Sequence, residues 1–153
     1  MAFSTFAVAQ QHPNFTGLWR LDPDRSRMVG VGGRVGPGPQ DREITWIIAH
    51  GEPRISVTVN VKDRDSSHEF SFDCTTDGNE CTNYLPDLNE IRRMRASWAA
   101  DTLLMTQTAH TPRNNFETAD RLYLSDDGQE LVFERIITDT RGERVVRQVF
   151  RKQ

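Results

Sequence analysis

The feature that most constrains the fold is a series of short alternating segments separated by turn signals. In residues 54–62, Ile55, Val57, Val59 and Val61 alternate with polar side chains. A period of two is typical of a β-strand with one buried face. Comparable segments occupy residues 14–21, 42–50, 54–62, 67–75, 80–85, 91–99, 102–109, 115–125, 130–139 and 143–152.

No segment has a helical period, and most connections are short enough to be tight hairpins. Closing an antiparallel meander removes its exposed edges. The sequence therefore predicts an all-β fold: an antiparallel up-and-down β-barrel of about 8–10 strands with little or no helix. The glycines of residues 30–36 match no phosphate-binding spacing and predict a lid or Ω-type loop.

Composition limits the classes of partner. The 153 residues suit one domain, and the net charge is −3, from 19 basic and 22 acidic residues that are interspersed. Without a basic block, a nucleic-acid partner is not expected. No apolar run approaches the ~18 residues of a membrane span.

The N-terminus and the cysteines predict export. Residues 1–9 are apolar and end in Ala7-Val8-Ala9, a small-x-small pattern that precedes signal-peptidase cleavage. We expect a signal-peptide remnant there, or alternatively a disordered N-terminus, followed by a single barrel domain in residues 10–153. A two-residue turn at Asp77-Gly78 places Cys74 opposite Cys81. This predicts a disulfide in a periplasmic or secreted protein, with two free thiols as the alternative.

Several motifs carry a family resemblance. Gly17-x-Trp19 on the first strand, followed by a series of hairpins, resembles the lipocalin and fatty-acid-binding superfamily. Residues 15–26, 76–80, 98–103 and 124–131 are similar to exported bacterial lipocalin-like proteins, many of them functionally unassigned. The resemblance implies a small barrel with a small-molecule cavity. Two departures argue against a fatty-acid ligand: residues 24–40 are too rich in Gly and Pro for the helical pair, and no tyrosine follows Arg147.

Turn registers predict what such a cavity contains. A turn at Asp127-Gly128 places Asp120 opposite Arg135, and one at Arg141-Gly142 places Arg135 opposite Gln148. These residues form a polar row on an otherwise apolar face, where an isolated charge is costly and a paired one is expected. A turn at Ala100-Asp101 places Met94 opposite Gln107 and brings Gln107 to the same interior.

The predicted ligand-binding residues combine this row with aromatic walls. They are Arg135, Asp120, Gln148, Gln107, Trp19, Trp46, Phe133 and Phe150. The alternatives are a structural Asp120–Arg135 ion pair and aromatic side chains that only fill the core. Arg92 is a further interior candidate, although Arg92, Arg93 and Arg95 together are typical of a solvated face.

Three functions follow. The first is an exported barrel that holds a small, partly apolar molecule, with Arg135 orienting a polar or anionic group. The second is a lyase, isomerase or cyclase that uses Asp120 or His50 as its acid/base group, and the third is an envelope protein with a filled barrel. No cofactor is expected, and the isolated His12, His68 and His110 predict no metal site.

Overall fold

The computed structural model describes residues 11–29, 35–37, 40–110 and 115–153. Its strands are β1 (Gly17–Val29), β2 (Val35–Pro37), β3 (Glu43–Gly51), β4 (Arg54–Lys62), β5 (Ser67–Thr75), β6 (Asp77–Leu85), β7 (Glu90–Ala99), β8 (Thr102–His110), β9 (Asn115–Leu124), β10 (Glu130–Asp139) and β11 (Gly142–Lys152). The only helical element in the described residues is one 3-10 turn, η1 (Pro86–Leu88). None of the described helices is long and apolar enough to cross a membrane.

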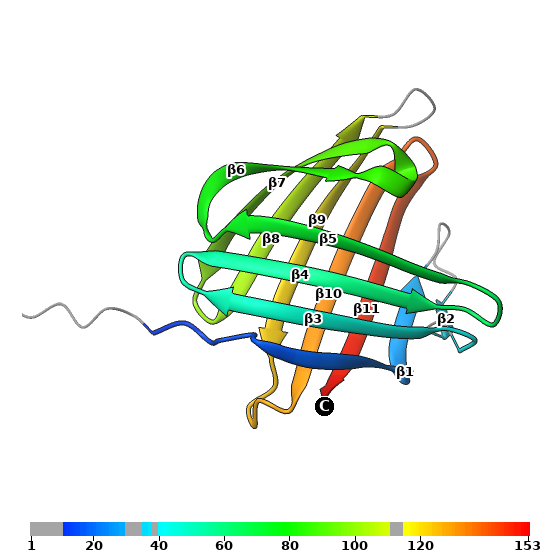
Figure 1. Cartoon of the computed structure of the whole chain (residues 1–153), viewed down its shortest axis with the longest axis horizontal. Coiled ribbons are helices and arrows are strands. Elements are labelled where there is room, and N and C mark those ends of the chain that lie inside the picture. Colours follow the sequence, from blue (N-terminus) through cyan, green and yellow to red (C-terminus); the bar gives the residue numbers. More distant parts are fainter. Residues whose placement is uncertain (1–10, 30–34, 38–39, 111–114) are drawn as a thin grey trace, which may run out of the picture.

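The strands form one antiparallel sheet that curls into a nearly closed barrel. Their order is β5-β4-β3-β1-β11-β10-β9-β8-β7-β6, and β2 pairs with β1 outside this path. In Figure 1, β3, β4 and β5 run across the strands β7 to β11 behind them. The predicted all-β barrel is therefore confirmed.

One end of the barrel is closed by aromatic side chains. Phe15 and Trp19 are fully buried there, and the Trp19 indole N–H donates to the Phe15 carbonyl at 2.9 Å. A Cβ at Gly17 would lie 3.3 Å from the Trp19 nitrogen, so glycine permits this close approach. The Gly17-x-Trp19 motif thus builds the closed end of the barrel.

The barrel has one seam, between β5 and β6. These two strands are the ends of the sheet and do not pair, so the predicted Cys74–Cys81 hairpin ladder is wrong. The predicted disulfide is nevertheless present, with the two Cα atoms 5.3 Å apart. Asn83 also crosses the seam: its Oδ1 accepts the Asp73 N–H at 2.9 Å and its Nδ2 donates to the Asp73 carbonyl at 3.1 Å. A covalent bond and a side-chain amide thus replace the missing ladder.

Two of the three interior hairpin registers were predicted correctly. Asp120 lies opposite Arg135, and Met94 lies opposite Gln107. The β10–β11 register is shifted by two residues, so Arg135 faces Val146 and Phe133 faces Gln148. The Asp139 carboxylate accepts the Arg141 N–H at 2.8 Å, which starts the turn one residue earlier than expected. An even shift keeps every side chain on its predicted face.

The stretch predicted as a lid is partly strand. Residues up to Val29 extend β1 beyond an irregularity between Asp22 and Arg27, and β2 pairs with this extension. Residues 30–34 and 38–39 lie outside the described residues, as does the predicted signal-peptide remnant.

Candidate ligand-binding cavity

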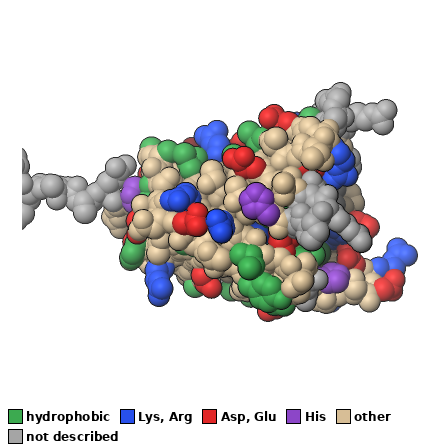
Figure 2. Space-filling model, turned by 90° about the horizontal axis from the view of Figure 1, so that it is seen from above, with side chains coloured by type: hydrophobic (Ala, Val, Ile, Leu, Met, Phe, Trp, Pro, Cys, Tyr) green, Lys and Arg blue, Asp and Glu red, His purple; other side chains and the backbone are tan. Residues whose placement is uncertain are grey.

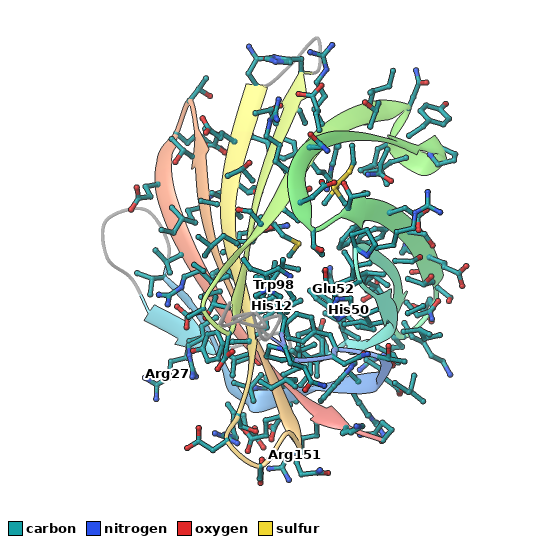
Figure 3. The ribbon with its side chains drawn as sticks, turned by 90° about the vertical axis from the view of Figure 1, so that its left-hand side faces the viewer. His12, Arg27, His50, Glu52, Trp98 and Arg151 are labelled. Atoms are coloured by element: carbon teal, nitrogen blue, oxygen red, sulfur yellow. A yellow bond between two sulfur atoms is a disulfide. The ribbon has the colours of Figure 1, made fainter. Side chains whose placement is uncertain are left out.

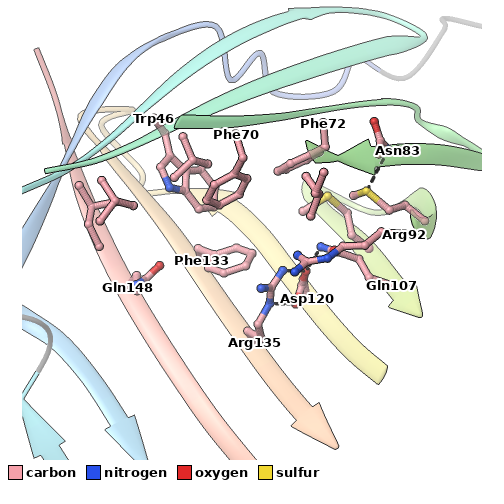
Figure 4. A pocket seen from close by; sticks show the side chains of 16 residues that line it. Trp46, Phe70, Phe72, Asn83, Arg92, Gln107, Asp120, Phe133, Arg135 and Gln148 are labelled. Carbon is pink, nitrogen blue, oxygen red and sulfur yellow. Dashed lines mark hydrogen bonds and ion pairs between the residues drawn. The ribbon is translucent and has the colours of Figure 1, made fainter. Parts of the chain in front are cut away.

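A cavity of about 180 Å³ lies inside the barrel, on the side away from the closed end. Its lining includes Ile44, Val61 and Leu85, which lie near the strand ends where β4 connects to β5 and β6 connects to β7. Figure 4 shows Trp46, Phe70 and Phe72 lying across the pocket from the polar group of Asp120 and Arg135. The cavity is thus apolar on one side and polar on the other.

The apolar side comes from strands whose inward residues are aromatic or branched. Trp46 on β3 and Phe133 on β10 meet edge to face, with ring centroids 4.9 Å apart. Phe70 and Phe72 on β5 complete this side, and Met94 and Met105 border the cavity beside Gln107 and Asp120. Flat rings and flexible thioethers form a surface that suits a planar or short aliphatic group.

The polar side centres on the predicted ion pair. Arg135 donates from Nε and Nη2 to the two carboxylate oxygens of Asp120, both at 2.8 Å, and Gln107 donates to Asp120 at 3.1 Å. The Asp120 side chain is 0% exposed, whereas that of Arg135 is 24% exposed. Such bidentate geometry fixes the plane of the guanidinium. Within the described residues, Asp120 is the only hydrogen-bond acceptor of the Arg135 side chain, so the remaining N–H groups of Arg135 are available to a ligand.

A second ion pair borders the same cavity. Arg92 donates from Nε to Glu90 at 2.8 Å and lies over the Phe116 ring, 5.2 Å from its centroid. Arg93 and Arg95 are exposed, as predicted for a solvated face. For Arg92 that prediction is wrong, and its interior alternative is right, because Arg92 lies opposite Ala109 on the inward face.

The structure brings together six of the eight predicted ligand-binding residues. Those lining the cavity are Arg135, Asp120, Gln148, Gln107, Trp46 and Phe133. Trp19 and Phe150 do not line it: both are fully buried nearer the closed end, where Phe150 packs against Trp46 at 4.7 Å between ring centroids. Both side chains face inward as predicted, but inward alternation does not reveal how far along the barrel the empty space extends.

The sequence reasoning missed several lining residues, notably Phe70, Phe72 and Asn83. The alternation of β5 placed Phe70 and Phe72 on one face, and that was the available signal. No sequence signal pointed to Asn83, because its role depends on the seam between two unpaired strands.

His50 belongs to a separate network at the closed end. Its side chain is 1% exposed; Nδ1 accepts the Phe15 N–H at 3.1 Å, and Nε2 lies 2.8 Å from Glu52 Oε1. Because Nδ1 is an acceptor, Nε2 carries the proton and donates to Glu52. Trp98 Nε1 also donates to Glu52, at 2.9 Å. Figure 3 shows His12, His50, Glu52 and Trp98 gathered within this end of the barrel.

This network holds Glu52 in its charged form. Burial raises the pKa of Glu52, but hydrogen bonds from Thr76, His50 and Trp98 outweigh burial and leave the pKa below 4.5. The sequence predicts His50 and Asp120 as candidates for an acid/base group. Both ring nitrogens of His50 and both oxygens of Asp120 are engaged by internal partners. In this arrangement neither presents a free proton-transfer atom to the cavity.

The described residues contain no group of three or more His, Cys, Asp or Glu side chains placed to hold a metal ion. His12 instead stacks on Trp98 with ring centroids 4.3 Å apart. On the face shown in Figure 2, charged side chains of both signs are interspersed.

Comparison with known proteins shows which solved structures share this fold. The sequence matches no protein-family model and no curated protein. Human cRBP IV is 14% identical over 92% of this chain and 99% of its own, with a TM-score of 0.61. Zebrafish ileal bile acid-binding protein, complexed with cholic acid, is 15% identical over 91% and 98%, with a TM-score of 0.57. Secretory abundant heat soluble protein 4 from Ramazzottius varieornatus is 12% identical over 95% and 99%, with a TM-score of 0.59. The chain therefore shares the barrel fold of these three proteins, as the sequence predicted.

Proposed function

We propose that this barrel binds a small, partly apolar acid in its interior cavity. The observation that carries the proposal is the Arg135 guanidinium, held rigidly by Asp120 at the edge of a largely apolar cavity. A carboxylate, sulfonate or phosphate accepts the remaining N–H groups of Arg135. The Phe133 ring, with its centroid 5.0 Å from the Arg135 guanidinium carbon, and Trp46, which meets that ring edge to face, contact the apolar body of the ligand.

The size of the cavity restricts the ligand. At about 180 Å³ it is below the ~300–1,000 Å³ usual for drug-sized ligands. It is close to the ~150 Å³ engineered apolar cavity that admits benzene. We therefore expect a ligand with one ring or a short branched chain, in contrast to a long-chain lipid. Cholic acid in the zebrafish structure combines an apolar body with an acidic group, and this combination supports the chemical class.

The test compares benzoate with benzyl alcohol, which share a ring and differ in charge. Calorimetry should find benzoate bound at least tenfold more tightly by the wild type. The double variant Asp120→Asn/Arg135→Gln removes the guanidinium without leaving a buried unpaired carboxylate, and it should abolish this preference. Arg93→Gln, the same change on an exposed outward side chain, should keep it. Equal affinity for the two probes in the wild type would contradict an acidic ligand.

A filled barrel remains the competing role, and native mass spectrometry separates it from binding. Protein isolated from its own source should carry a co-purified small acid that is released on denaturation. A wild type that carries no ligand and binds neither probe would favour a structural role.

We further propose that the protein is exported. The Cys74–Cys81 disulfide supports this, because such bonds persist mainly in oxidising compartments. Cell fractionation combined with thiol labelling tests it: both cysteines should resist labelling in the periplasmic or secreted fraction until a reductant is added. Labelling of both cysteines in freshly lysed cytoplasm would contradict export.

A further inference from the structure

A second recess lies at the end of the barrel opposite the closed end, which we call the mouth, beside the proposed acid site. Its lining includes Arg92, Arg135, Arg141, Arg144, Thr118 and Asp139. Arg92 and Arg135 also line the interior cavity, so the two spaces share part of their walls. A molecule bound at Arg135 therefore lies within reach of this recess.

The recess contains two buried polar atoms that have no hydrogen-bond partner in the described part of the chain. They are Thr118 Oγ1, on a residue that is 2% exposed, and Arg144 Nε. Thr118 lies opposite Ile137, and Ile137 lies opposite Arg144, so both belong to one row across β9, β10 and β11. Unpartnered buried groups cost stability, and an acidic group bound between these two atoms would accept a hydrogen bond from each.

The charges of the recess favour an anion. Four described arginines line the recess, and they share three carboxylate partners: Glu90, Asp120 and Asp139. Arg144 Nη2 donates to Asp139 at 2.6 Å, which orients the guanidinium. Asp139 is held ionised, since its pKa is lowered by the Arg141 backbone N–H and by the charges of Arg144 and Arg141. Among the described residues, these pairs leave one positive charge over in the recess.

We propose that Thr118 and Arg144 form a second anion subsite, which binds a second acidic group of the cavity ligand. This rests on the proposed function, in which Arg135 binds the first group. Arg135 is two residues along β10 from Ile137, which lies in the row of Thr118 and Arg144, so the two sites are about 7 Å apart along a strand. The ligand is then a small diacid whose two acidic groups lie about 7 Å apart on an apolar spacer.

The experiment uses three probes with the same ring: benzoate, terephthalate and phthalate. The two carboxylates of terephthalate lie on opposite sides of the ring, whereas those of phthalate are adjacent. By calorimetry, the wild type should bind terephthalate at least tenfold more tightly than either benzoate or phthalate. The preference over phthalate, which has the same charge, tests spacing separately from net attraction.

Two variants assign the effect to the recess. Thr118→Val and Arg144→Gln should each reduce the affinity for terephthalate and leave that for benzoate unchanged, while Arg93→Gln should change neither. Thr118→Val should also raise the melting temperature of the ligand-free protein, because it removes an unpartnered buried hydroxyl. A lower melting temperature would show that the hydroxyl already has a partner, and would overturn the subsite.

The failures of the two proposals are distinguishable. Tight benzoate binding without any preference for terephthalate over phthalate overturns the second subsite and leaves the proposed function standing. If none of the three probes binds, the proposed function fails, and the diacid ligand fails with it.

Discussion

At the scale of single residues, the interior charges depend on one another. Asp120 is fully buried and accepts three hydrogen bonds from Arg135 and Gln107. A buried carboxylate is tolerated only with such partners, and removing one side of a buried pair costs about 3–5 kcal/mol. Because Arg135 is partly exposed, water can solvate its charge when Asp120 is removed, whereas it cannot solvate the buried charge of Asp120 when Arg135 is removed.

We therefore predict that the two single substitutions lower the stability by unequal amounts. Arg135→Gln should lower the free energy of unfolding by about 3 kcal/mol, and Asp120→Asn by less. The double variant should be more stable than Arg135→Gln alone, since no unpaired carboxylate remains. Urea unfolding of the four proteins of this cycle measures the coupling. Additive losses would show that the two side chains act independently.

Glu52 gives the protein a pH-dependent contribution. Its pKa in the folded state lies below 4.5, so its stabilising effect is present above 4.5 and is lost as pH falls through the lower folded-state value. Glu52→Gln should have the lower melting temperature at pH 7, and its curve should converge with that of the wild type in acid. Thermal scans from pH 7 to pH 3 measure this, with the exposed Glu69→Gln as the control. Parallel curves would remove Glu52 from the acid response.

At the scale of elements, hairpin chemistry decides what the sequence can predict. A tight turn fixes which residues face each other, so the Asp120–Arg135 contact follows from Asp127-Gly128 and is found. The same reasoning misjudged β10–β11, where an Asp139 side chain competes for the turn. The predicted pairing of β5 with β6 was also wrong, since the turn between two strands does not show whether they are neighbours in the sheet or its two ends.

The seam provides the prediction at this scale. The disulfide closes a short loop with a sequence separation of 7, for which loop entropy gives about 2.5 kcal/mol. Cys74→Ala/Cys81→Ala should be less stable by roughly this amount and should exchange the Asp73 amide hydrogen faster, although Asn83 still accepts it. Hydrogen exchange at strands distant from the seam, such as β9, serves as the control. Uniform acceleration over the whole barrel would show that the seam does not open locally.

At the scale of the whole molecule, the barrel divides into a filled half and a hollow half. Phe15, Trp19 and Phe150 fill the closed end, and the 180 Å³ cavity lies on the other side of Trp46. Sequence alternation identifies inward side chains throughout, but packing density depends on how all the strands converge. The sequence therefore places Trp19 and Phe150 on the inward face but does not give their depth along the barrel.

This division predicts different consequences for two equivalent substitutions. Phe150→Ala removes a ring that is contacted on all sides and should cost about 4 kcal/mol, within the range for buried phenylalanine. Phe133→Ala should cost about half as much, because the Phe133 ring already borders empty space and has fewer contacts to lose. The enlarged cavity should then admit a two-ring acid such as 2-naphthoate, as measured by calorimetry alongside urea unfolding. Equal losses of stability, with no change in ligand size, would mean that the cavity is closed by side-chain movement in solution and that the barrel is filled throughout.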